Sequence, residues 1–323
     1  GLYDGKFADF SFSDTYCPLT FSGMRGCEAR VWAGFMKANP AEAAPYEDYA
    51  RGENPSRRMP LWIKPDRKLT LEDMFDFMRD HYEGTSMDMT KDLGAGPFAC
   101  PYRWRPMGFE VDGKNYIHER ATSTQQTGFS FVAQCRNWLP RQIGGILWFG
   151  VDDTYSTCYV PMYCGITEIP LCFRVGNGDM VTYSPTSAFW LFNQVANFAY
   201  GRYKDMIVDI RKVQSFLETS FQQEVAQNDT KMKDETDAAS LVAFANRFSN
   251  AQASRMFDSW KKLSEYLLVK YIDGNVKKTN ANGNFITTPY GQDRMEMPDQ
   301  PPYPEFWYRK IVEDCGENIK EVK

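Results

Sequence analysis

The sequence predicts an α+β fold in which a strand-rich part is followed by a long helical part. Three segments rich in β-branched and aromatic residues lie at 128–136, 144–151 and 157–163, and short connections containing Pro or Gly separate them. Because no helical pattern lies between these segments, we expect antiparallel strands and not βαβ units. Two segments of helical periodicity, at about 186–227 and 235–271, complete the prediction.

The first 68 residues are expected to be irregular with short elements, because five prolines interrupt positions 40–65. A helix is then predicted from Thr70 to Gly84. Thr70 and Asp73 have the spacing of a capping box, and Gly is a typical residue at a helix end.

A hairpin is expected next, because Asp112-Gly113 is a strong two-residue turn signal. With the three segments described above, this gives about five antiparallel strands between residues 109 and 163. Thr124 to Thr127 lie at the mouth of the first of the three segments, where strand alternation would place Gln125 and Gln126 on opposite faces.

The helical part is expected to break near Gly201, and the short charged link 228–234 predicts that the two long helices are antiparallel neighbours. One apolar stripe on the second helix is typical of core packing. We therefore expect a single domain with a sheet-containing part (1–183), a helical lobe (184–275) and an irregular tail (276–323). An aromatic cluster in the tail is expected to attach the C-terminus to the body: Tyr303, Phe306, Trp307 and Tyr308.

Composition excludes several classes of function. The 323 residues carry a formal net charge of −5 and have a pI of about 5.3, which argues against a nucleic-acid-binding protein. Eight cysteines without a CxxC motif, and only two histidines, favour neither a disulfide scaffold nor a zinc site. The most apolar helical run, 188–200, is too short and too polar to span a bilayer.

Conventional catalytic patterns are weak. Neither GxSxG nor HExxH occurs, and His81 and His118 are interpreted as structural histidines. The adjacent acids Asp152 and Asp153 follow a predicted strand and are interpreted as turn formers. Residue patterns alone therefore indicate a globular protein with a polar-lined sheet.

Five motifs extend this interpretation through a resemblance. They are HYEGTSMDMTKDLGAGPF (81–98), ERATSTQQTGFSFVAQCR (119–136), GGILWFGVDD (144–153), YVPMYCGIT (159–167) and VGNGDMVTYSPTSAFWLFN (175–193). Together, and in this order, they resemble the bacterial N-terminal-nucleophile cysteine dipeptidases. The resemblance implies a four-layer αββα sandwich, hydrolysis of dipeptides, no metal and no cofactor. The compartment, bacterial cytoplasm or periplasm, is left open, because we find no targeting signal in this sequence.

In that family an N-terminal cysteine attacks the amide carbonyl, and its own α-amino group serves as the base. Residue 1 here is Gly, and the surroundings of Cys17 do not resemble the family's nucleophile segment. We therefore expect this chain to be the C-terminal part of the enzyme, with the nucleophile upstream, and to be inactive alone. A sheet without its first strands would leave an open edge, so we also expect self-association.

The resemblance also implies which residues face the site. The family has an amide side chain that donates to the oxyanion, and this role matches Gln125 or Gln126. It also has an arginine that stabilises negative charge or binds the substrate carboxylate, and this role matches Arg136. Further candidates would bind the substrate: Thr124, Thr127, Thr85, Asp88 and Arg103. Two alternatives remain open at this point. One is a non-catalytic relative that binds or supports another molecule, and the other is an amidase acting on acyl-amino acids.

Overall fold

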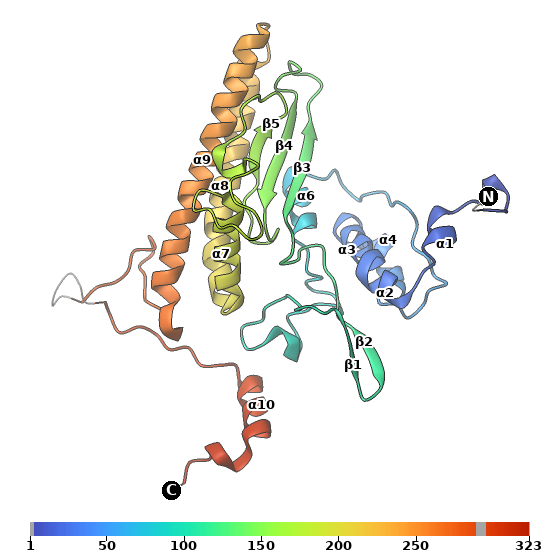
Figure 1. Cartoon of the computed structure of the whole chain (residues 1–323), viewed down its shortest axis with the longest axis vertical. Coiled ribbons are helices and arrows are strands. Elements are labelled where there is room, and N and C mark those ends of the chain that lie inside the picture. The colour runs from blue at the N-terminus through green and yellow to red at the C-terminus, as the bar shows by residue number, and fades with distance from the viewer. Residues whose placement is uncertain (1–2, 289–294, 323) are drawn as a thin grey trace. The chain divides into compact units, whose positions relative to one another are not determined.

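The computed structural model describes residues 3–288 and 295–322, and its contacts gather into two compact units (Figure 1). The first unit comprises the chain up to Gly94 together with Pro101–Thr124. The second comprises Ala95–Cys100 and everything from Gln125 onward. Helices and antiparallel strands both occur, which confirms the predicted α+β class. The single-domain division into three parts remains a prediction.

Short helices dominate the first unit, where the sequence predicts irregular structure with short elements over residues 1–68. They are α1 (Phe12–Tyr16), α2 (Phe21–Gly23), a π-helical turn (Met24–Glu28), α3 (Ala29–Ala38), α4 (Pro40–Ala43) and α5 (Glu47–Ala50). Buried Trp32 and Ala33 place α3 against a core that also includes Tyr82. Trp32 Nε1 donates to the Ala43 carbonyl at 3.0 Å, and this hydrogen bond connects α3 to the end of α4.

Helix α6 (Leu71–Met78) begins as predicted, since Thr70 and Asp73 form a reciprocal capping box. It ends earlier than Gly84. The Arg79 N–H is shared between the carbonyls of Phe75 and Asp76, which tightens the last turn. Tyr82 then has a φ of 64°, a left-handed conformation that cannot continue a helix.

The predicted hairpin is confirmed. Strands β1 (Gly108–Val111) and β2 (Lys114–Ile117) pair in antiparallel register, and Asp112 and Gly113 both have positive φ, as a type I′ turn requires. This hairpin forms a sheet of its own. The five strands expected between residues 109 and 163 therefore do not form one continuous meander.

The second sheet, in the second unit, has the antiparallel order β3 (Phe129–Cys135), β4 (Gly145–Val151) and β5 (Val160–Tyr163). Side chains of β3 alternate: Ser130 and Val132 are buried, whereas Phe129 and Phe131 are exposed. A sheet with one packed face is expected to show this pattern.

Three helices pack beside this sheet (Figure 1): α7 (Ala188–Tyr200), α8 (Tyr203–Met232) and α9 (Ala238–Tyr271). The break predicted near Gly201 separates α7 from α8. The apolar stripe of α9 is buried as expected, and Phe192 of α7 stacks on Trp260 with ring centroids 4.4 Å apart. Helices α8 and α9 run side by side, and the Tyr163 N–H of β5 donates to Ser249 Oγ of α9 at 3.1 Å.

The tail is not wholly irregular, because Glu305–Cys315 form helix α10. Tyr303, a residue of the predicted aromatic cluster, lies just before this helix, and its ring lies 5.8 Å from the ring of Phe98. Among the residues that the structure describes, no helix is both long and apolar enough to cross a membrane.

Candidate active site

Two carboxylates are buried where strand β4 ends. Asp152 follows Val151 directly, and its N–H donates to the Gly128 carbonyl at 3.0 Å, which ties it to the start of β3. Asp152 has a φ of 65°, a conformation uncommon outside glycine. Asp152 and Asp153 are each only 1% exposed. The end of β4 therefore carries two acids in a strained and buried turn.

Asp152 is only half satisfied. Its Oδ1 accepts a hydrogen bond from Asn193 Nδ2 of α7 at 3.0 Å, while its Oδ2 is buried without a partner. Burial raises the pKa of the Asp152 carboxyl to about 7, the negative charge of Asp153 adds to this, and the Asn193 hydrogen bond opposes it. A carboxyl with a pKa near neutrality can both release and accept a proton under physiological conditions.

Asp153 has a fuller set of partners. Its Oδ2 accepts from the Tyr200 hydroxyl at 3.2 Å, and its Oδ1 accepts from the Tyr155 N–H at 3.1 Å. Burial, followed by the charges of Asp153 and Asp152, raises the pKa of the Tyr200 phenol, so the phenol remains a hydrogen-bond donor. Helix α7 thus supplies one donor to each acid. We call Asp152, Asp153, Asn193 and Tyr200 the carboxylate cluster.

The loop after the cluster is anchored by α8. Gln214 Nε2 donates to the carbonyls of Tyr155, at 3.0 Å, and Thr157, and Glu218 Oε1 accepts from the Tyr159 N–H at 2.8 Å. A Cβ at Gly150 would lie 2.9 Å from the Thr157 side chain, so only glycine allows this close approach. The two acids therefore stand on a braced loop.

The predicted amides lie at the end of the sheet that also carries Asp152, where β3 begins and β4 ends. Strand β3 begins at Phe129, and Gln125 and Gln126 form a turn before it. Strand alternation therefore does not apply to them. Gln126 is exposed, whereas Gln125 and Thr127 are half-buried. Thr124 is also half-buried and is the last residue of the first unit.

Arg136 lies at the opposite end of β3. Its Nη1 contacts both carboxylate oxygens of Asp229 on α8, at 2.9 and 2.8 Å, and its Nη2 donates to the Ile143 carbonyl. The seven residues of β3 separate Arg136 from Gln126 by roughly 20 Å or more. The structure therefore does not bring the predicted arginine and amides together at one small substrate.

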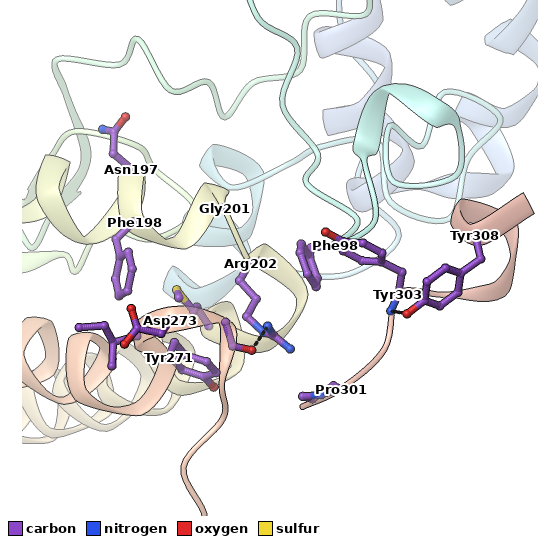
Figure 2. A pocket seen from close by; sticks show the side chains of 13 residues that line it. Phe98, Asn197, Phe198, Gly201, Arg202, Tyr271, Asp273, Pro301, Tyr303 and Tyr308 are labelled. Carbon is purple, nitrogen blue, oxygen red and sulfur yellow. Dashed lines mark hydrogen bonds between the residues drawn. The ribbon is translucent and has the colours of Figure 1, made fainter. Parts of the chain in front are cut away.

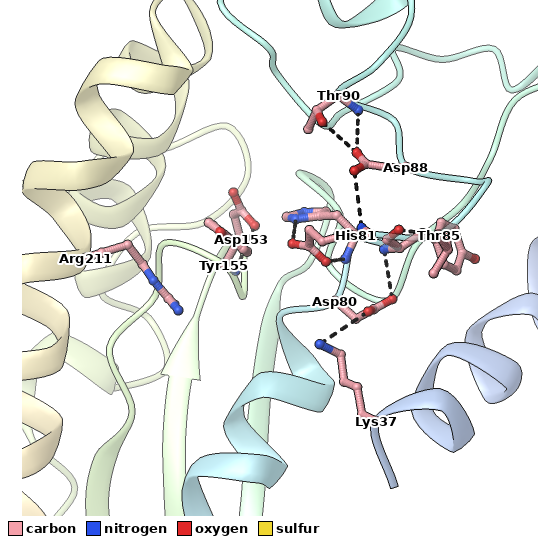
Figure 3. Close-up of polar contacts among 12 residues, drawn as sticks. Lys37, Asp80, His81, Thr85, Asp88, Thr90, Asp153, Tyr155 and Arg211 are labelled. Carbon is pink, nitrogen blue, oxygen red and sulfur yellow. Dashed lines mark hydrogen bonds and ion pairs between the residues drawn. The ribbon is translucent and has the colours of Figure 1, made fainter. Parts of the chain in front are cut away.

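The remaining predicted residues belong to the first unit, and Figure 3 shows the loop contacts of Thr85 and Asp88. Thr85 Oγ1 donates to the Tyr82 carbonyl at 2.8 Å. Asp88 Oδ1 accepts from the N–H and hydroxyl of Thr90, at 3.0 and 2.6 Å. Arg103 contacts Asp92 at 2.5 Å and is 7% exposed. These side chains brace the loop that contains them.

His81 is interpreted from the sequence as structural, and the structure places it in the interior of the first unit at 1% exposure. Its Nδ1 lies 3.4 Å from Glu83 Oε1, and its ring meets the Tyr102 ring edge-on, with centroids 4.8 Å apart. No group of three or more His, Cys, Asp and Glu residues in the described ranges could hold a metal ion.

Sequence reasoning missed the carboxylate cluster. Asp152 and Asp153 were predicted to be turn formers, and the positive φ at Asp152 is consistent with a turn. Their burial, and their pairing with Asn193 and Tyr200 more than 40 positions away, depend on the packing of α7. The available signal was the pair of acids directly after a strongly apolar strand.

Comparisons with known proteins address the resemblance. A sequence model of the family described as "Peptidase family C69" matches residues 1–215, a range that includes the whole carboxylate cluster. "Probable dipeptidase B" of Lactococcus lactis subsp. lactis (strain IL1403) is 25% identical over 242 residues, which cover 74% of this chain and 44% of that protein. "Probable dipeptidase" of Latilactobacillus sakei is 23% identical over 220 residues, or 67% of this chain and 40% of that protein.

A third relative, "Probable dipeptidase" of Salmonella dublin, is 25% identical over 169 residues, which cover 51% of this chain and 32% of that protein. The chain therefore spans less than half the length of the curated relatives that it matches. The family resemblance seen in the motifs is confirmed.

Proposed function

Because the chain belongs to peptidase family C69, we propose that it forms part of a cysteine-dependent dipeptidase whose active site includes Asp152. The observation that carries this proposal is the buried Asp152–Asn193 pair within the region matched by the family. The names of the three relatives support a dipeptide as the substrate.

In the proposed reaction a cysteine thiolate attacks the carbonyl carbon of the peptide bond. The C–N bond then breaks, and the departing amine takes up a proton. Water hydrolyses the resulting thioester and regenerates the thiol. The carboxylate cluster contains no thiol, so we place the nucleophile on a cysteine outside it. Asp152 has the pKa to hold and return a proton during these steps, and Asn193 holds it in position.

Gln125 or Gln126 is the proposed amide donor to the oxyanion, because both lie just before β3, at the end of the sheet where Asp152 follows β4. Thr127 lies between them and β3, so its hydroxyl is a proposed contact for the substrate. Thr124, Thr85, Asp88 and Arg103 remain proposed contacts for the ends of the dipeptide. Arg136 is proposed to act indirectly, by fixing α8 through Asp229.

We further propose that β3–β5, with α8 and α9 packed against β5, form one sheet layer and one helical layer of a four-layer αββα sandwich. The strand order supports this, because β3 pairs only with β4 among the described residues. Its other edge is therefore available to further strands of the same sheet.

The proposal is tested with the whole enzyme on a panel of dipeptides and their N-acylated analogues. Dipeptides should be cleaved, and Asp152→Asn should lower kcat by about 10²-fold or more, with a smaller change in KM. Asp234→Asn, at a side chain that is 88% exposed, is the matched control and should leave turnover unchanged. Full turnover by Asp152→Asn would contradict the proposed role, and preference for N-acylated substrates would favour an amidase.

We expect the 323-residue chain by itself not to cleave dipeptides, because the surroundings of Cys17 do not resemble the nucleophile segment of the family. Its activity is measured with and without Cys17→Ala. Turnover that survives Cys17→Ala would overturn the expected inactivity. Turnover that Cys17→Ala abolishes would identify Cys17 as the nucleophile and contradict the expectation that Cys17 does not have this role.

A further inference from the structure

A pocket of about 640 Å³ lies in the second unit, where α7 meets α8 (Figure 2). The end of α9 and the segment leading into α10 complete its wall. No residue of the carboxylate cluster lines it. Several lining residues, among them Tyr271 and Tyr303, lie beyond residue 215, where the family match ends. The pocket is therefore separate from the proposed active site.

Arg202 gives the pocket an unused hydrogen-bond donor. The residue is 7% exposed. Its Nε donates to Asp205 Oδ2 at 2.6 Å and its Nη1 donates to the Gly274 carbonyl at 3.1 Å, while its Nη2 is buried without a partner. In Figure 2 the guanidinium lies beside the Phe98 ring. Buried polar groups are nearly always hydrogen-bonded, so this donor indicates a missing acceptor.

Aromatic rings form the opposite wall. The Phe98 ring lies 4.9 Å from Arg202 Cζ and 5.8 Å from the Tyr303 ring, and the Tyr303 ring lies 5.6 Å from the Tyr308 ring. The Lys204 N–H fixes Phe98 at the start of α8 by donating to its carbonyl at 3.0 Å. The Tyr303 N–H donates to the Tyr308 hydroxyl at 3.3 Å. A flat apolar group fits between such rings.

We propose that this pocket binds a small aromatic carboxylate, with the carboxylate on Arg202 Nη2 and the ring against Phe98, Tyr303 and Tyr308. A carboxylate supplies the acceptor that the guanidinium lacks. Asp205 already pairs with Arg202, and Asp273 also lines the pocket. These two negative charges favour a monoanion over a dianion such as phosphate. Because Phe98 covers the guanidinium, binding requires a small shift of its ring.

Phenylacetate is the probe for the test, with calorimetry and NMR on the 323-residue chain. We expect saturable binding that moves the signals of Phe98 and Tyr303. Benzylamine has the ring with the opposite charge, and inorganic phosphate has the charge without the ring. Both should bind at least about tenfold more weakly. The inference is overturned if either binds as well as phenylacetate, or if phenylacetate does not bind.

Variants separate the two parts of the pocket. Arg202→Gln should weaken phenylacetate binding by about tenfold or more. Arg202 also donates to the Gly274 carbonyl, so its substitution could affect folding. A second position is therefore tested. Tyr308 is 45% exposed, and Tyr308→Ala should weaken binding several-fold, whereas Tyr308→Phe, which keeps the ring, should not. Unchanged affinity in both Arg202→Gln and Tyr308→Ala would overturn the assignment.

Discussion

Asp152 and Asn193 are joined by a hydrogen bond of 3.0 Å, and this bond connects the end of β4 to the middle of α7. Only one oxygen of the carboxylate takes part, because the other is buried without a partner. The pair therefore stabilises the packing of α7 while it leaves an acid that is costly to ionise. A residue that lowers stability in its charged form is a candidate for function and not for structure alone.

The first prediction concerns the pH dependence of stability. In the unfolded chain Asp152 ionises at about pH 4, whereas the folded protein holds the proton until about pH 7. The contribution of this group to stability is therefore complete below about pH 4 and is lost as the pH rises to about 7. In Asp152→Asn this loss is absent. Between about pH 5 and pH 8, the variant should lose less free energy of unfolding than the original chain, by on the order of 2 kcal/mol.

Urea unfolding at the two pH values measures the difference. Asp234→Asn is again the control, because a substitution at this exposed side chain should not alter how the free energy of unfolding changes with pH. If the free energies of unfolding of Asp152→Asn and of the original chain change equally with pH, the pKa of Asp152 is not raised in the folded protein.

A second prediction concerns Arg136 and Asp229. Arg136 is 3% exposed, and its Nη1, which contacts both carboxylate oxygens of Asp229, connects the end of β3 to α8. Arg136→Gln should destabilise the protein by about 3 kcal/mol. Burial raises the pKa of Asp229 and Arg136 opposes this, so loss of Arg136 should raise that pKa further. The destabilisation should therefore be larger at about pH 8 than at about pH 5.

Denaturant curves of Arg136→Gln, Asp229→Asn and the double variant test this pair. The double variant should be more stable than Arg136→Gln, because no unpaired buried charge remains. Additive effects would mean that the two residues contribute independently.

Gln214 should govern the mobility of the loop after Asp153. Its amide donates to the carbonyls of Tyr155 and Thr157, so Gln214→Leu leaves both acceptors without this donor. We expect faster hydrogen exchange at the amides of Thr157 and Tyr159, with little change at the amides in the middle of α9. In the whole enzyme the same variant should lower kcat, because Asp152 stands on this loop. Unchanged exchange would show that other contacts hold the loop.

The free edge of β3 should promote self-association. Phe129 and Phe131 are exposed on this strand, and edge strands with exposed apolar residues readily pair with other chains. Phe131→Lys should increase the monomer fraction seen by light scattering. Val208→Lys, at an exposed apolar position of α8, is the matched control and should have less effect. A clean monomer of the original chain at high concentration would contradict the prediction.

Local sequence patterns determined the elements that depend on neighbouring residues. The capping box of Thr70 and Asp73, the turn at Asp112-Gly113 and the break at Gly201 all follow from short-range conformational preferences. The stripe on α9 is also predictable, because helical periodicity fixes which residues share a face. The five motifs together identified the family, although each is short.

Only the tertiary structure decided where charged groups became buried. Asp152 looks like an ordinary turn residue in sequence, yet the fold buries it, and this burial raises its pKa. Arg136 looked like part of the site, yet Asp229, 93 positions away, engages it at the far end of β3. The unused donor of Arg202 emerges only when Phe98, Gly274 and Asp205 surround it. Burial and hydrogen-bond pairing depend on segments distant in the chain, and local preference carries no information about them.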